Sequence, residues 1–92
     1  MVEQLMHDTD RAAAVVDDIV VFLKREIIRD DTIHLTRDDK IIEAGLIDSM
    51  GIVRLLAHLQ QRYGIDHIAN QDLSLQNFRS IGSIAALVSR YL

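Results

Sequence analysis

The sequence predicts an all-α protein, a bundle of three main helices and one short helix with a long loop after the first helix. Apolar residues recur at three- and four-residue spacing in three separate segments, which is typical of amphipathic helices. Ser, Asp and Gly residues stand where these helices would start and stop. The chain has 92 residues, 49% of them hydrophobic, which is enough for one small core. We expect residues 1–9 to form a flexible lead-in and residues 10–92 to form the domain.

The first helix is predicted to run to about Arg29, with Thr9 or Asp10 as its N-terminal cap. The run from Ile19 to Phe22 favours a strand by propensity, but the helical period holds over the whole segment and its flanks lack turn residues. The apolar face of this helix contains Ala12, Val16, Ile19, Val20, Leu23 and Ile27. The charged residues Asp17, Asp18, Lys24 and Arg25 lie mainly on its other side.

A long connection follows, from Asp30 to Ile47. A loop of this length in a small domain is usually functional or held down by its own apolar residues. Gly45 gives the backbone freedom just before the next helix, and Leu46 and Ile47 are expected to anchor the loop. The other apolar residues inserted in this loop are Ile33, Leu35, Ile41 and Ile42.

The second helix is predicted from Ser49 to Tyr63, a stretch without proline. Asp48 and Ser49 are residue types that cap a helix start, and Gly64 followed by Ile65 is typical of a helix end. A helix N-terminus carries partial positive charge and unpaired N–H groups, so a phosphate ester on Ser49 would be stabilised there. The inward face contains Ile52, Leu55, Leu56, Leu59 and Tyr63.

The remaining residues predict a polar loop over 66–73, a short helical turn over 74–78 and a last helix capped by Ser80. The apolar face of the last helix contains Ile81, Ile84, Ala85, Val88 and Leu92.

One segment carries a resemblance to a known family. Residues 39–50 read Asp-Lys-Ile-Ile-Glu-Ala-Gly-Leu-Ile-Asp-Ser-Met, which resembles the phosphopantetheine attachment segment of acyl and peptidyl carrier proteins. The similarity continues through Arg-Tyr-Gly-Ile at 62–65 and Asn-Phe-Arg-Ser-Ile at 77–81, and covers roughly residues 15–92. The fold it implies is an acyl-carrier-like bundle.

The resemblance also implies a chemistry. A phosphopantetheinyl transferase would move 4′-phosphopantetheine from coenzyme A onto the Ser49 hydroxyl in the presence of Mg²⁺. The thiol at the end of this covalent arm would hold an acyl or aminoacyl group as a thioester, so the chain would be a carrier and not an enzyme. In the family, the residue at the position of Asp48 faces the transferase and its metal. If Asp48 has only a structural role, its negative charge interacts favourably with the helix dipole.

The outward side of the second helix is the predicted partner surface, made of Met50, Arg54, Ala57, His58 and Gln61. An exposed Met beside the attachment serine is an adaptable contact for several partners, although it could instead pack under the loop. Many carriers have an acidic second helix, whereas this one has Arg54, Arg62 and His58 and no acidic residue. Partner surfaces should then be less basic, or even acidic. The alternative is that Arg54 and Arg62 only form a solvated face of the helix.

Other parts of the family pattern indicate which enzymes act with the chain. Residues 77–81 resemble those of stand-alone carriers that work with adenylating ligases, including aminoacyl and D-alanyl carriers. This points to an adenylating ligase and a downstream synthase or transferase as partners, in a specialised or natural-product biosynthetic pathway.

Composition excludes several other classes of protein. The formal charge of −4 argues against nucleic-acid binding, and the apolar runs are too short to span a membrane. The first ten residues lack the apolar region of a secretory signal, so we expect a cytoplasmic monomer. There is no cysteine, and no metal site is predicted. The four histidines without metal-ligand spacing are His7, His34, His58 and His67.

Two other functions are weighed against the carrier. The chain could be an unmodified helical interaction module, in which Ser49 is only a helix cap. It is a poor candidate for a serine hydrolase, because the residues around Ser49 lack the Gly-x-Ser-x-Gly elbow. Replacing Ser49 by alanine separates the first two, since only the carrier needs the hydroxyl.

Overall fold

The structure, a computed structural model, describes residues 8–92, with side chains described from residue 11 onward. Within this range the secondary structure is entirely helical, with no strand, and the predicted all-α fold is confirmed. The elements in chain order are α1 (Asp8–Phe22), η2 (Leu23–Ile27), α2 (Ser49–Tyr63), η3 (Asn70–Asp72), η4 (Leu75–Phe78) and α3 (Ile81–Ser89).

The start of α1 lies earlier than expected. The helix begins at Asp8, so Thr9 and Asp10 lie inside it and neither is its N-terminal cap. Asp8 and Thr9 are therefore helical, although the sequence assigned them to the lead-in. The rest of the predicted lead-in, residues 1–7, lies outside the described residues, as does His7.

The apolar face of α1 is centred one residue away from the predicted face. Val15, Ile19 and Leu23 are completely buried, and Val15 was missed by the prediction. Ala12 and Val16 lie at the flank and are only half-buried. The reason is that α1 packs more extensively against α3 than against α2, which sets the rotation of its buried stripe.

The C-terminal end of the first helix widens into the π-helix η2, close to the predicted end at Arg29. Arg29 then adopts a positive φ of 59°. This left-handed conformation commonly ends a helix, although glycine or asparagine usually provides it. The chain turns there into the long first loop.

The predicted ends of α2 are confirmed. Gly64 has a φ of 69°, and the N–H groups of Gly64 and Ile65 both donate to the Gln60 carbonyl. Ile65 is buried, so its apolar contact accompanies this cap as expected. The inward side chains Ile52, Leu55 and Leu59 are buried, and Leu56 and Tyr63 are half-buried.

The C-terminal third contains both confirmed and corrected predictions. The short turn appears as η4, and Ser80 caps α3, its Oγ accepting from the Ser83 N–H at 3.1 Å. The 3-10 turn η3 was not predicted, because residues 70–72 have no apolar period. Leu92 lies beyond the end of α3 and is 42% exposed, so its place on the apolar face was wrong. Leu87 is buried instead.

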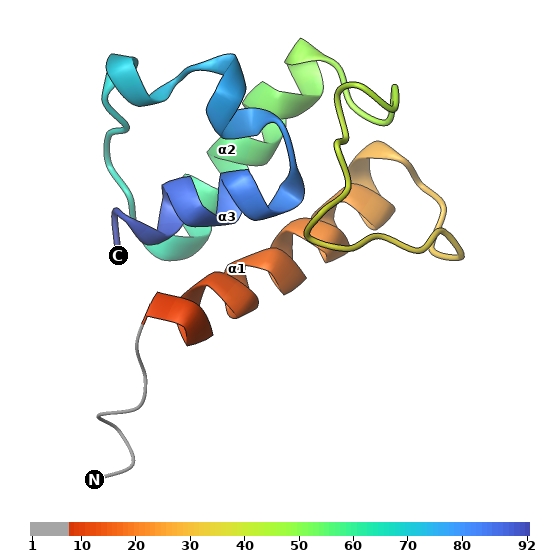
Figure 1. The fold of residues 1–92 in the computed structure, drawn as a ribbon, viewed down its shortest axis with the longest axis horizontal. Coiled ribbons are helices and arrows are strands. Elements are labelled where there is room, and N and C mark those ends of the chain that lie inside the picture. The colour runs from red at the N-terminus through yellow and green to blue at the C-terminus, as the bar shows by residue number, and fades with distance from the viewer. Residues whose placement is uncertain (1–7) are drawn as a thin grey trace, which may run out of the picture.

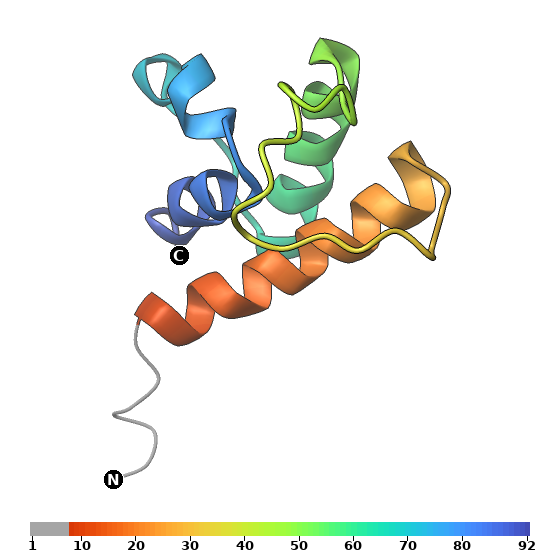
Figure 2. The ribbon, with the colours of Figure 1, turned by 45° about the vertical axis from the view of Figure 1, so that its right-hand side comes forward.

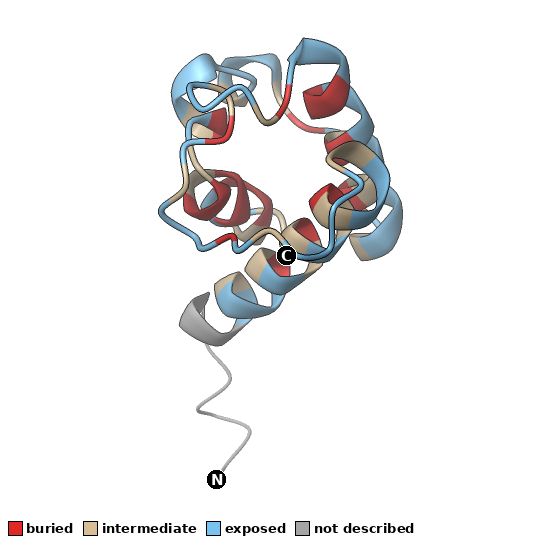
Figure 3. Cartoon of the chain, turned by 90° about the vertical axis from the view of Figure 1, so that its right-hand side faces the viewer, coloured by how far each residue is buried: buried red, intermediate tan, exposed pale blue. Residues whose placement is uncertain are grey.

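The helices enclose a single core. Figure 1 shows α1 running across one side of the molecule, below α3, and Figure 3 shows the buried residues on the inner sides of the helices. The first loop adds its own buried side chains to this core, namely Leu35, Ile41 and Ile47. The long loop is therefore held down by apolar anchors, as its sequence predicted.

The middle of the first loop also caps α3. In Figure 2 it runs along α1 before turning up toward α2. The N–H of Gly82 donates to the Arg37 carbonyl at 2.7 Å, and that of Ile81 donates to the Asp39 carbonyl at 3.2 Å. A Cβ atom on Gly82 would lie 3.0 Å from the Arg37 carbonyl oxygen. The loop thus satisfies N–H groups that would otherwise be unpaired at a helix start.

A polar contact joins α1 to the end of α2 and makes stability depend on pH. The Tyr63 hydroxyl donates to the Asp18 carboxylate, with Arg62 at 3.6 Å from the same carboxylate. Burial, and then the hydrogen bond to Asp18, raises the pKa of Tyr63 from 10.0 to about 12.

We expect the contribution of Tyr63 to the free energy of unfolding to be complete below pH ~10 and to decline toward pH ~12. The sign follows because the folded state favours the neutral phenol, whose pKa is raised. Urea unfolding of the parent and Tyr63→Phe between pH 8 and pH ~12 measures this contribution by difference. A difference that does not change with pH would contradict the expectation.

Candidate functional site

Ser49 is the first residue of α2, and its neighbour Asp48 is the cap. Asp48 has extended backbone angles (φ −109°, ψ −174°), and its Oδ1 accepts from the Gly51 N–H at 2.9 Å. Ser49 is exposed, and within residues 8–92 its hydroxyl makes no hydrogen bond. The capping role therefore belongs to Asp48, and the Ser49 hydroxyl faces solvent uncommitted.

The loop before Ser49 is fixed by buried residues and a tight turn. Ile41 is completely buried, Ile47 is 6% exposed, and the Leu46 N–H donates to the Ile41 carbonyl at 2.9 Å. Gly45 has a φ of 76° with open space around it, so it is needed for its conformation and not for its small size. Ile47 is the buried anchor that the sequence predicted, while Leu46 is half-buried.

Gly51 is a residue of this site that sequence reasoning missed. A Cβ atom at this position would lie 2.4 Å from Ile47 Cγ1. The glycine lets the Ile47 side chain pack directly on the first turn of α2, which holds the loop against the helix. The signal in the sequence was a glycine inside the first turn of an amphipathic helix. Glycine is unfavourable in a helix, so its presence there indicates a packing requirement.

The start of α2 combines unpaired N–H groups, which favour an anion, with the Asp48 carboxylate, which opposes one. The N–H groups of Ser49 and Met50 have no intrahelical acceptor, as in any helix start, and the first turn contains no acidic residue. The guanidinium of Arg54, one turn further along, lies 3.9 Å from the Glu26 carboxylate and donates to the Glu26 carbonyl at 3.4 Å. This pair is half-exposed, so its contribution to stability is about 0–1 kcal/mol.

An open groove of about 510 Å³ adjoins Ser49, between the end of the first helix and the start of α2. Its walls expose more polar than apolar surface, and they carry one anion, Asp48, and one cation, Arg54. The exposed Ser49 hydroxyl, the unpaired N–H groups at the helix start and the nearby Arg54 guanidinium are compatible with a phosphopantetheine group on Ser49. The lining residues are Ile27, Gly45, Leu46, Ile47, Asp48, Met50, Gly51 and Arg54.

Comparison with protein families agrees with this geometry. A family model described as "Phosphopantetheine attachment site" matches residues 19–88, which is most of the chain. The chain belongs to this family. The prosthetic group of the family is 4′-phosphopantetheine, and its members are carriers that interact with phosphopantetheinyl transferases and synthetic enzymes. No curated protein and no solved structure shows significant similarity to the chain.

The structure places the predicted partner surface of this carrier domain along one side of α2. Met50 is 68% exposed, and Arg54, Ala57 and Gln61 are also exposed. His58 differs, because it is half-buried and its ring stacks on Phe22 of α1 with 4.4 Å between ring centroids. The role of this surface in partner binding stays a prediction.

The face beside this surface is more apolar than the sequence indicated. Val53 is 59% exposed and lies one helical turn from Ser49. It was not assigned to the partner surface, because a valine between Ile52 and Arg54 fits either side of the helix. Met50 and Val53 together form an exposed apolar pair at the start of α2.

The described part of the carrier domain contains neither a metal-binding cluster nor a membrane-spanning helix. Residues 8–92 contain no group of three potential metal ligands close enough to hold an ion. No helix among them is both long enough and apolar enough to cross a membrane.

The capping role of Asp48 and its predicted role in transferase recognition are separable by substitution. Asp48→Ala removes the cap and is expected to lower the free energy of unfolding by about 1 kcal/mol, whereas Asp48→Asn keeps a capping oxygen and should change it little. Urea unfolding measures both. If the transferase recognises the Asp48 carboxylate, the arm should be attached more slowly in both variants. Attachment to Asp48→Asn at the parent rate would contradict that recognition.

Proposed function

We propose that this carrier domain tethers acyl or aminoacyl groups through a 4′-phosphopantetheine arm attached to Ser49. The observation that supports this most directly is the uncommitted Ser49 hydroxyl, exposed at the start of α2 while Asp48 performs the capping. It lies inside the segment that matches the phosphopantetheine family. A serine that served only as a cap would be expected to accept a backbone N–H itself.

The residues around Ser49 have distinct tasks in this proposal. Ile47 and Gly51 hold the loop against the first turn of α2, which carries Ser49. The unpaired N–H groups of Ser49 and Met50 at the start of α2 would favour the negative charge of a phosphate linked to Ser49. The arm supplies a terminal thiol for thioester formation. The domain needs no base of its own, because the transferase performs the attachment.

Intact mass spectrometry tests the attachment. The purified protein is incubated with coenzyme A, Mg²⁺ and a broad-specificity phosphopantetheinyl transferase, and proteolysis then locates the added group. We expect one added phosphopantetheine, on the peptide that contains Ser49. No gain by a folded protein that was not already modified would favour the unmodified interaction module instead.

We further propose an adenylating ligase as the loading partner and a downstream synthase or transferase as the acceptor, in a specialised biosynthetic pathway. The support is the resemblance of residues 77–81 to stand-alone carriers that work with such ligases. The absence of acidic residues from α2 also separates this domain from carriers that meet basic enzyme surfaces. Mass analysis of the arm-bearing domain after incubation with candidate ligases, ATP and acyl or amino acids would identify the cargo.

Arg54 is expected to affect encounter with the loading enzyme. Arg54→Glu reverses a charge beside the groove at Ser49 and should slow loading by a cognate ligase, on the order of a few-fold at low salt. The domain should stay folded, because both Arg54 and Glu26 are about half exposed, with side-chain values of 50% and 54%. Rates of thioester formation at low and high salt measure the effect.

Arg62→Glu is the matched control for Arg54→Glu. Arg62 is paired with Asp18 in a similar ion pair, but it lies at the far end of α2 from Ser49. We expect this variant to load at close to the parent rate. Unchanged loading of Arg54→Glu at low salt would remove Arg54 from the partner surface.

A further inference from the structure

Residues 69–74, which include η3, are attached to the domain without any buried side chain. Every residue in this segment is half-buried or exposed, and Leu73 is 43% exposed. The nearest buried residues are Ile68 before it and Phe78 after it, at 5% and 8% exposure. A segment with few buried apolar contacts opens at lower free energy than the helices around it. Residues 69–74 are therefore held in place mainly by polar contacts.

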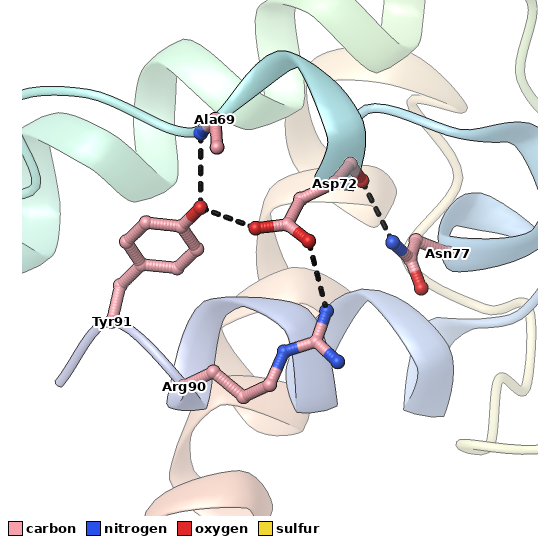
Figure 4. A network of polar contacts seen from close by, with 5 residues as sticks. All are labelled: Ala69, Asp72, Asn77, Arg90 and Tyr91. Atoms are coloured by element: carbon pink, nitrogen blue, oxygen red, sulfur yellow. Dashed lines mark hydrogen bonds and ion pairs between the residues drawn. The ribbon is translucent and has the colours of Figure 1, made fainter.

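Those contacts converge on the end of α3, as Figure 4 shows. The Tyr91 hydroxyl donates to the Asp72 carboxylate at 2.5 Å and accepts from the Ala69 N–H at 2.9 Å. Arg90 lies 3.9 Å from the same carboxylate, and its guanidinium side chain is 58% exposed. A single phenol thus binds both ends of η3, while the exposed arginine contributes less.

The other contacts of Asp72 are local, and its N–H donates to the Ala69 carbonyl at 2.9 Å. Its carbonyl accepts from the Asn77 side chain at 2.7 Å, which ties the segment to η4, five residues along the chain. The Asp72 hydrogen bond also raises the pKa of Tyr91 above its ordinary value. The long-range attachment of the segment depends mainly on Tyr91.

Two residues of the segment, Asn70 and Leu73, help to line a groove on α2. This groove, about 350 Å³ in volume, has Val53, Leu56, Ala57 and Gln60 on its helix side. The opposite wall contains His67, Ile68, Asn70 and Leu73. Val53 and Ala57 follow Ser49 at four-residue spacing, so this wall continues the helix face that carries Ser49. Any movement of residues 69–74 would change the apolar surface within one turn of Ser49.

We propose that residues 69–74 form a movable strap along the α2 groove, and that the Tyr91 hydroxyl, bound to Asp72 and Ala69, is the latch that holds the strap closed. Breaking the latch frees the strap between Ile68 and Phe78 and widens the groove between Val53 and Leu73. The helices stay folded during this opening, because their buried residues do not belong to the strap. The latch acts in the same way whether or not Ser49 carries an arm.

Amide hydrogen exchange followed by NMR tests whether the strap opens as a unit. The Asp72 and Leu73 N–H groups donate to carbonyls inside the strap, and neither contacts Tyr91 directly. In Tyr91→Phe we expect the amides of Ala69, Asp72 and Leu73 to exchange about 10- to 100-fold faster together, as for loss of a hydrogen bond to a charged group. The amides of buried helix residues such as Leu59 and Ile84 should exchange at the parent rate.

Tyr63→Phe is the matched control, because it removes another phenol that donates to a carboxylate, but on α2. It should leave the strap amides unchanged. Asp72→Asn provides a second way to weaken the latch, with Asp66→Asn as its control in the neighbouring loop. Faster exchange at Ala69 alone, or an equal increase in the strap and helix amides, would overturn the proposal.

The width of the groove is measurable independently. The chain contains no cysteine, so Val53→Cys and Leu73→Cys together introduce a unique pair of spin labels at two exposed positions. We expect a narrow distance distribution with the latch intact and a broader one, extended to longer distances, when Tyr91→Phe is added. The same narrow distribution in both proteins would mean that the strap does not move.

Discussion

Replacing Ser49 by alanine is expected to abolish attachment of the phosphopantetheine arm while the domain stays folded. The proposed attachment uses the hydroxyl of Ser49, and alanine supplies none. The Ser49 side chain is exposed and makes no hydrogen bond within residues 8–92, so its removal should change the free energy of unfolding by less than about 0.5 kcal/mol. Intact mass after transferase treatment measures the first effect, and urea unfolding measures the second.

Ser74→Ala is the matched control for this substitution. Ser74 is also exposed, also precedes a helical turn, and makes no side-chain capping hydrogen bond. We expect this variant to gain one phosphopantetheine like the parent. A mass gain that persisted in Ser49→Ala would move the attachment to another residue and refute the assignment of Ser49.

The second large effect is expected from Leu55→Ala, which should lower the free energy of unfolding by about 2–5 kcal/mol. Leu55 lies in the middle of α2 and is completely buried. Truncating a buried leucine costs about 2–5 kcal/mol, because a cavity remains where its methyl groups were packed. A chain of 92 residues has a total stability of about 5–14 kcal/mol at 0.05–0.15 kcal/mol per residue. One substitution thus removes a large part of it.

Urea unfolding followed by circular dichroism measures this loss. We expect a much lower midpoint for Leu55→Ala with a similar slope. Leu75→Ala is the matched control, because the same chemical change falls on a side chain that is 71% exposed. It should shift the free energy of unfolding by no more than about 0.5 kcal/mol. Similar losses in the two variants would contradict the assignment of Leu55 to the core.

The parts of the structure that were predictable from sequence depend on neighbours along the chain. The start of α2 was predictable because the Asp48 carboxylate reaches an N–H only three residues away. Its end was predictable because Gly64 adopts a conformation that glycine favours. Ser80 at the start of α3 is a third case of the same kind. The attachment segment was recognised for the same reason, since it is continuous in sequence.

The errors occurred where packing between helices decides the result. Val15 and Leu87 are buried because α1 and α3 lie against each other, and the helical period alone allowed a face rotated by one position. His58 fits the outward pattern of α2, yet it stacks on Phe22 because α1 passes beside it. Periodicity gives the width of an apolar stripe better than its centre.

The sequence by itself determined the helical class, the caps of α2 and α3 and the position of Ser49 at a helix start, because each depends on residues within one turn. Only the tertiary structure decided which sides of α2 remain open. The pair of Arg54 with Glu26 joins residues 28 positions apart, and that of Tyr63 with Asp18 joins residues 45 apart. The hydrogen bond from Tyr91 to Asp72 also joins residues that are distant in the sequence. Such contacts form only when the folded core brings distant segments together, so no local pattern contains them.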